Sequence, residues 1–203
     1  METSMKQLKY LALILSGIVI AFTALSCVSS ASGSAADHDR SRWSWLGENG
    51  GTYWYVPLEN LQAIQWNTDA PSAYTPIEDQ TVWHIERYSN GYIFGPVVVK
   101  FAGYPRLCQY LIGSITPSGR VFISFNAVEA IPIGSPSITT GTGEMVRQRG
   151  KWTFNMQMAS GSSSTQVAHW AFMQQCTPDQ PCWQDLPGSE GSIPELLAQC
   201  DKP

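Results

Sequence analysis

Charged side chains are scarce in this 203-residue chain, and they form no basic cluster. Asp, Glu, Lys and Arg make up 14% of the residues, against roughly 25% in an ordinary soluble domain. The 12 Lys and Arg are scattered, and the 16 Asp and Glu bring the formal net charge to -4. Because binding to nucleic-acid phosphates requires clustered basic residues, no nucleic-acid partner is expected. The 43% apolar content instead indicates a chain with a substantial core.

Residues that carry chemistry are also few. The only histidines are His38, His84 and His169. There is no Gly-x-Ser-x-Gly, the motif of a hydrolase nucleophile elbow, and no Cys-x-x-Cys or paired histidines at a metal-ligand spacing. Residues 141–143, Gly-Thr-Gly, are too short for a phosphate loop and are interpreted as a turn that opens a strand. No cofactor or metal is expected, and catalysis is not the favoured function.

One long apolar run is present, and it lies at the N-terminus. Residues 10–28 follow Lys6 and Lys9 and precede a stretch of small residues. This order predicts a secretory signal peptide with its cleavage region over residues 1–36. A retained anchor is the alternative, since the run would span about 28 Å as a helix. The protein is therefore expected to be secreted or periplasmic.

Cys27, at the end of that run, is a candidate lipidation site. Bacterial lipoproteins place their lipidated cysteine there, usually with Leu three positions earlier, whereas Ala24 takes that position here. Attachment to a membrane is expected only through an uncleaved signal or through such a lipid anchor.

The other four cysteines are an even number, as in a disulfide framework of an exported protein. Cys176 and Cys182 flank a short segment with two prolines and Asp179, which favours a compact turn and a local bridge. Cys108 would then pair with Cys200. A zinc site is the rival interpretation, and the spacing disfavours it.

From about Trp43 onward, apolar and polar residues alternate with a period of two. Asn90-Gly91 predicts a tight hairpin, and Pro96 predicts a bulge or an edge in its second strand. Residues 67–79 are interpreted as a loop. Ser192 and Glu195 form a capping box that predicts a short C-terminal helix. The expected strands cover residues 52–56, 81–88, 92–101, 109–115, 120–125, 144–148, 151–158 and 166–175.

Successive antiparallel strands with short connections predict an all-β fold, with residues 37–203 as a single β-rich domain. The preferred architecture is an up-and-down barrel of about eight strands, and a β-sandwich is the alternative. In outline it is similar to lipocalin-like barrels, but as an architecture only. The Gly-x-Trp triplet of that family belongs to the first strand, whereas Gly150-Lys151-Trp152 comes late in this chain.

Aromatic residues are plentiful, with eight tryptophans. Most should be core, but an apolar cavity with a few polar groups is also how ligand pockets are lined. Trp83, Tyr92 and Trp152 are the expected ligand-binding aromatics because their strands are best defined. Adjacent residues on a strand face opposite sides, so Trp83 is expected inside and His84 outside.

His169 is the fourth candidate ligand-binding residue, because Val167, Ala171 and Met173 share its face and leave room beside it. The leading hypothesis is an exported, non-enzymatic barrel that binds a small apolar molecule in its interior. The first alternative is a protein-interaction or inhibitor module that uses exposed loops. The second is a barrel enzyme that uses His169 or His84 with a nearby carboxylate. The free volume inside the barrel separates these hypotheses.

Overall fold

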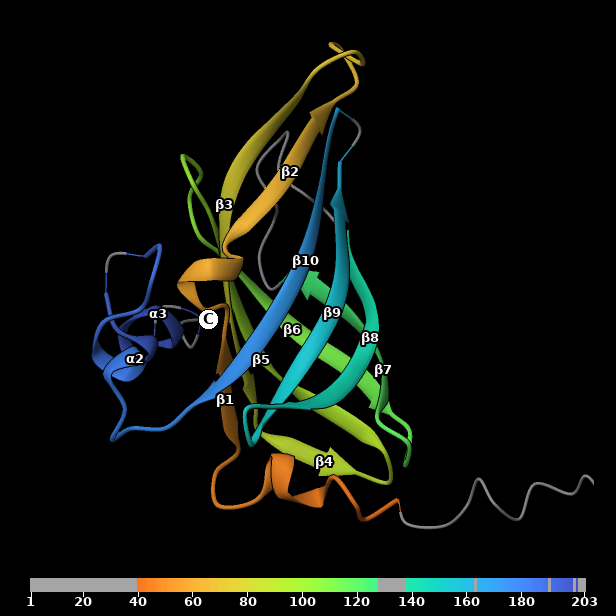
Figure 1. Ribbon diagram of the computed structural model, residues 1–203, viewed down its shortest axis with the longest axis vertical. Coiled ribbons are helices and arrows are strands. Elements are labelled where there is room, and N and C mark those ends of the chain that lie inside the picture. The colour runs from red at the N-terminus through yellow and green to blue at the C-terminus, as the bar shows by residue number, and fades with distance from the viewer. Residues whose placement is uncertain (1–39, 128–137, 163, 190, 199, 201–203) are drawn as a thin grey trace, which may run out of the picture. The chain divides into compact units, whose positions relative to one another are not determined.

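The computed structural model describes residues 40–127, 138–162, 164–189, 191–198 and 200 (Figure 1). The predicted signal peptide and Cys27 lie outside the described residues, so they stay predictions. Among the described residues, none of the helices has the length and hydropathy that crossing a bilayer requires.

The described chain is mostly β-strand, with short helical turns near both ends. Its elements are η1 (Ser44–Gly47), β1 (Thr52–Tyr55), η2 (Leu58–Asn60), β2 (Gln62–Asn67), β3 (Tyr74–Ile85), β4 (Arg87–Ser89), β5 (Tyr92–Phe101), β6 (Leu107–Ile115), β7 (Arg120–Ala127), β8 (Ile138–Gln148), β9 (Lys151–Gly161), β10 (Thr165–Cys176), α2 (Pro181–Gln184) and α3 (Ile193–Leu197).

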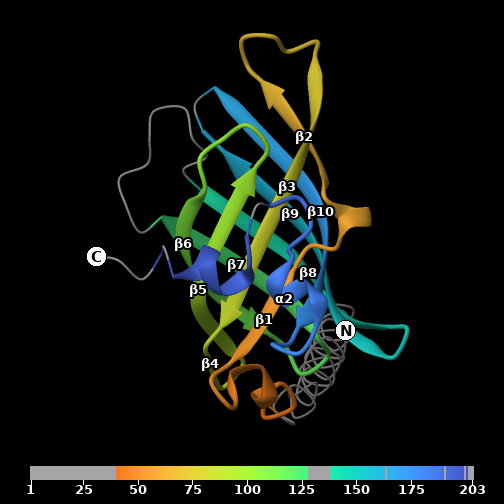
Figure 2. The same ribbon diagram turned by 90° about the vertical axis from the view of Figure 1, so that its left-hand side faces the viewer.

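The strands close into an antiparallel barrel. Each strand from β5 to β10 pairs with the next, β10 pairs with β2, β2 pairs with β3, and β3 pairs with β5. This ring has eight strands, and Figures 1 and 2 show it from two sides. The predicted up-and-down barrel is confirmed, and the sandwich alternative does not apply.

Two positions of the ring hold interrupted strands. β1 and β2 both lie between β3 and β10, separated by residues 56–61. β4 continues β3 beyond Glu86, because Trp83 pairs with Val97 whereas Arg87 already pairs with Phe94. One extra residue is therefore accommodated opposite Gly95 and Pro96, which is a β-bulge. The sequence predicted a bulge or an edge in the strand of Pro96; a bulge does lie opposite Pro96, but its extra residue is on the partner strand, and β5 is paired on both sides.

Gly95 is required at this bulge. A Cβ built on it would lie 1.8 Å from the backbone oxygen of His84. Only glycine permits such a close approach of two backbones.

Two sequence interpretations are wrong. Residues 67–79 are not a loop, because β3 begins at Tyr74 and pairs with β2. The first residues of β3 are exposed, so this hairpin lacks the one-sided apolar alternation that marks a strand. Gly141 and Gly143 are not a turn but part of β8. They leave room for the large side chains of Met156 and Met158, with which a Cβ on either glycine would collide.

The barrel interior forms the main core. β9 contributes Phe154 and Met156, as its alternation predicts. At the bottom of Figure 1, the orange turn η1 lies at one end of the barrel. There the Trp43 and Trp152 rings make an edge-on contact, with their centroids 4.9 Å apart. The Trp43 Nε1 donates a hydrogen bond to the Thr116 carbonyl. A second, smaller core lies between the outer face of β3 and β5 and the C-terminal segment, and it includes Val82, Val98, Leu186, Ile193 and Leu196.

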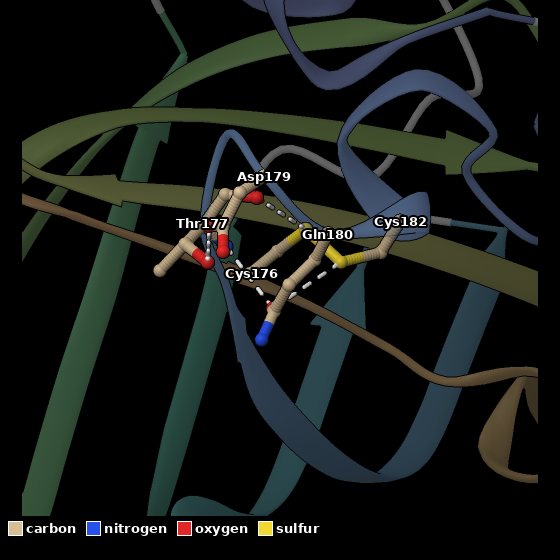
Figure 3. The surroundings of a disulfide bond; sticks show 5 residues. All are labelled: Cys176, Thr177, Asp179, Gln180 and Cys182. Carbon is tan, nitrogen blue, oxygen red and sulfur yellow. Dashed lines mark hydrogen bonds between the residues drawn. A yellow bond between two sulfur atoms is a disulfide. The ribbon is translucent and has the colours of Figure 1, made fainter.

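Both predicted disulfides are present, Cys108–Cys200 and Cys176–Cys182. The zinc interpretation is therefore wrong, because these sulfurs are bonded to one another. In Figure 3 the shorter bridge closes over a turn in which the Thr177 hydroxyl donates to Asp179 and lowers the pKa of that carboxyl. The predicted capping box of Ser192 and Glu195 begins α3. The bridges join the C-terminal segment to the barrel and indicate an oxidising compartment.

Candidate functional site

The barrel interior brings together two of the predicted ligand-binding residues, Trp83 and His169. Both line a cavity of about 10 Å³. Val167, Ala171 and Met173 lie on the same side of β10, as its alternation predicts. The lining residues are Asp79, Thr81, Trp83, Val99, Phe125, Thr139, Met158, Ser160, Val167, His169, Ala171 and Met173.

His169 is bound through both ring nitrogens. Its Nδ1 lies 2.9 Å from Oδ2 of Asp79, and its Nε2 lies 2.7 Å from the backbone oxygen of Asn60. Asp79 also accepts a hydrogen bond from the Thr81 hydroxyl. Because carboxylate and carbonyl oxygens are acceptors, the arrangement is satisfied when both ring nitrogens carry protons.

The electrostatics of His169 agree with this geometry. Burial lowers the pKa of His169, but the hydrogen bond and the negative charge of Asp79 raise it, as does the carbonyl of Asn60. The net pKa lies above the ordinary value of 6.5. His169 thus links β10 to Asp79 of β3 and to Asn60 of η2, and we call this set of contacts the clamp.

The clamp stabilises the backbone at the break between β1 and β2. Asn60 ends η2 inside that break, and Gln80, which is buried in β3, binds the other side of it. The Gln80 amide accepts from the Val56 N–H and donates to the Val56 and Pro187 carbonyls. These side chains replace ladder bonds that the interrupted strand does not make.

His84 lies on the opposite side of β3 from Trp83, as expected. Its ring stacks on Tyr53 with centroids 4.1 Å apart, and its Nε2 lies 2.9 Å from the Gly50 oxygen. Its Nδ1 is 3.6 Å from Glu86. These contacts pack His84 against the outer surface, away from the interior cavity.

Tyr92 and Trp152 do not line the cavity. Tyr92 is 54% exposed on the outer face. Trp152 is half-buried at the end of the barrel that η1 covers, with the Arg147 guanidinium 5.9 Å from its ring centroid. The interior cavity thus gathers two of the four residues proposed from the sequence, and a ligand-binding role for each of the four stays a prediction.

Large side chains fill the interior around the cavity. Trp54, Trp83, Phe125, Phe154, Met156 and Met173 are each buried to 1% exposure or less. The remaining 10 Å³ is space for about one water molecule. Trp83 lines this space, and its buried Nε1 has no hydrogen-bond acceptor among the described residues.

A second feature, which the sequence analysis missed, is an exposed group of apolar residues on β5, β6 and β7. Tyr92, Tyr110, Ile112 and Phe122 are each 49–56% exposed, and Phe94 pairs with Ile112 between them. We call these five residues the aromatic wall. The unbroken apolar run of residues 110–112 was a signal for it, because a strand with one solvated face alternates instead.

The described residues contain no group of three or more His, Cys, Asp or Glu placed to hold a metal ion. Comparison of the chain with protein-family models, with curated proteins and with solved structures finds no match.

Proposed function

We propose that this protein is an exported, non-catalytic binding module that recognises a protein partner through its aromatic wall. The observation that carries the proposal is the contrast between the barrel's two faces. The interior has room for about one water molecule, whereas four large apolar side chains of the wall are about half exposed. Contiguous exposed apolar groups of this kind are typical of interaction sites.

The wall is contiguous because its residues are neighbours in the register. Tyr92 and Phe122 flank Ser114, and Phe94 faces Ile112 in the next row. Directly paired side chains on neighbouring strands have Cβ atoms roughly 5 Å apart. Tyr110 lies two residues from Ile112 on the same exposed face of β6. The five side chains thus occupy adjacent rows on one outer face of the sheet.

Charge is absent from the rows that cross the wall. In the described strands, two successive outer rows carry no charged side chain from β5 around to β10. The first row comprises Tyr92, Ser114, Phe122, Thr142, Gln157 and Trp170, and the second comprises Phe94, Ile112, Ser124, Thr140, Ala159 and Ala168. Depletion of charge with enrichment of Tyr and Phe is the composition of an interface centre.

Arginines border the wall. The Arg87 guanidinium lies 5.7 Å from the Phe94 ring centroid, and Arg120 begins the strand that carries Phe122. The expected partner is therefore a protein with an apolar patch bordered by carboxylates, because such a surface would match both the wall and its rim.

Site-specific photo-crosslinking in the native host tests this proposal. A photoreactive residue replaces Ile112 in the wall, and a matched variant carries it at Gln62, an exposed polar position of β2. We expect a discrete protein adduct from position 112 that is lost when Phe122→Lys is added. Equal labelling from both positions, or no adduct from position 112, would overturn the proposal.

A small molecule bound in the interior is the second candidate, and one observation favours it. Trp83 lines the cavity, and its Nε1 is a buried donor without an acceptor among the described residues. Such a group calls for an acceptor, supplied by a water molecule or by a ligand. Movement of Met158, an adaptable side chain, would enlarge the space.

Native mass spectrometry of freshly purified protein distinguishes the two occupants. A bound molecule of defined mass that disappears in Trp83→Phe would support interior ligand binding. A mass equal to that of the polypeptide alone, with tryptophan fluorescence unchanged on titration with apolar molecules, would count against it.

A further inference from the structure

We propose that the outer face of β7, β8, β9 and β10 carries a binding site for neutral saccharides, centred on Trp170. The site lies beside the aromatic wall and includes none of its five residues, although Arg120 borders both. It is centred on Trp170 rather than on the wall, so the variants that test it differ from those that test the protein partner.

Trp170 presents a large aromatic ring to solvent. Its side chain is 59% exposed, yet its Nε1 donates to Oδ1 of Asn155 at 2.8 Å. The ring also lies parallel to that of Phe172, at 6° and 6.4 Å between centroids. These two contacts fix the ring orientation, so little side-chain freedom remains to be lost when a ligand stacks on it.

A shallow hollow of about 360 Å³ adjoins the ring. The register explains its composition, because Gln157 pairs with Trp170 and with Thr142, while Glu144 pairs with Asn155 and with Arg120. Outward side chains of four adjacent strands thus converge on one place. The hollow is lined by Arg120, Thr142, Gly143, Glu144, Asn155, Gln157 and Trp170.

This set of side chains matches the two kinds of surface that a pyranose presents. The C–H face of the sugar ring can stack on the Trp170 ring, in place of water. Its hydroxyl groups each donate and accept, and planar groups such as the Glu144 carboxylate, the Arg120 guanidinium and the Gln157 amide supply both functions.

The balance of charge favours a neutral sugar. The lining contains one carboxylate and one guanidinium, which face each other across β7 and β8. An anionic sugar would gain from Arg120 but be repelled by Glu144. A protein partner is the weaker alternative, because six of the seven lining residues are polar or glycine and only one is apolar.

Binding to a panel of neutral oligosaccharides tests the site. The probes are glucose-, mannose- and N-acetylglucosamine-based oligosaccharides, measured by tryptophan fluorescence and by isothermal titration on the full exported chain. We expect at least one probe to bind with a Kd of about 1 mM or tighter. Trp170→Ala should weaken that binding about tenfold, Gln157→Ala should weaken it less, and Trp170→Phe should retain part of it.

Tyr74→Ala is the matched control, since Tyr74 is also a highly exposed aromatic residue but lies on the distant hairpin of β2 and β3. It should bind the same probe like the unaltered protein. Trp170 is exposed, so circular dichroism should show that its variants fold. Failure of every neutral probe, binding only to anionic saccharides, or binding that survives Trp170→Ala would each overturn the proposal.

Discussion

At the residue scale, the buried polar side chains of β3 and β10 act on the backbone of the broken strand beside them. His169 and Asp79 form a buried pair at 2.9 Å, and His169 also holds Asn60. A pair of this kind resembles part of a catalytic site, but both imidazole nitrogens are engaged with acceptors. Because these contacts favour the protonated imidazole, we expect the stability of the folded state to depend on the protonation of His169.

His169→Gln should remove a pH-dependent part of the stability. The pKa of His169 is raised on folding, so its contribution is fully present below the unfolded pKa and is lost as pH rises through the folded pKa. We expect the unfolding free energy of the unaltered protein to fall more steeply than that of the variant as pH rises above the ordinary histidine pKa of 6.5. Urea unfolding across this range measures both slopes. Equal slopes of unfolding free energy against pH for the two proteins would contradict a stabilising role for the protonated His169.

Gln80→Leu should destabilise the barrel by about 2–4 kcal/mol, because it leaves the N–H and C=O of Val56 without their partners. Gln62→Leu is the control, since Gln62 is exposed and surface changes usually cost less than about 0.5 kcal/mol. Urea midpoints of the two variants give the comparison. Similar midpoints would show that Gln80 does not stabilise the backbone between β1 and β2.

At the scale of elements, the C-terminal segment is attached to the barrel by one long-range and one local bridge. Cys108 and Cys200 are 92 residues apart, whereas Cys176 and Cys182 are 6 apart. The long bridge joins β6 to the end of the chain beyond α3, and the short one closes the turn that precedes α2. The two bridges constrain very different lengths of the unfolded chain.

The paired variant Cys108→Ala with Cys200→Ala should therefore lose more stability than Cys176→Ala with Cys182→Ala. The chain-entropy relation gives a loss of about 4–5 kcal/mol for the first and about 2 kcal/mol for the second. Thermal and urea unfolding of both variants under non-reducing conditions measures the difference. An equal loss would mean that native contacts, rather than loop length, set the contribution of each bridge.

Prediction of strands from the sequence succeeded where one face of the strand is buried and the other is exposed to solvent. β9 is an example, since Phe154 and Met156 are buried and Gln157 is exposed. It failed for the outer part of the β2–β3 hairpin, where no face is buried and the alternation is absent. It also failed at Gly141, because the glycine is required by Met158 on a neighbouring strand, and a local pattern holds no information about that neighbour.

At the scale of the whole molecule, a closed, filled and doubly bridged barrel is suited to an oxidising compartment. Closure removes exposed sheet edges, and the bridges add to a core that large side chains fill almost completely. Charge is sparse on the outer strands, so the functional surfaces proposed here are distinguished by aromatic and amide groups rather than by electrostatic attraction.

Intact mass of the exported protein tests the predicted export and oxidation together. We expect a chain that begins after the predicted signal region of residues 1–36, with four cysteines that react with an alkylating reagent only after reduction. A mature N-terminus at Cys27 bearing a lipid would show that lipid attachment, not simple cleavage, completes export. Thiols that react without reduction would contradict the oxidised barrel.

The sequence by itself determined the strand period, the tight turn at Asn90-Gly91, the capped C-terminal helix and the pairing of four cysteines, because each depends on residues close together or on a small number of alternatives. Only the tertiary structure decided how full the barrel is, that His169 binds Asp79 and Asn60, and that Trp170 and Glu144 share one hollow. These features depend on side chains from strands far apart in the chain, whose positions are set by register and closure.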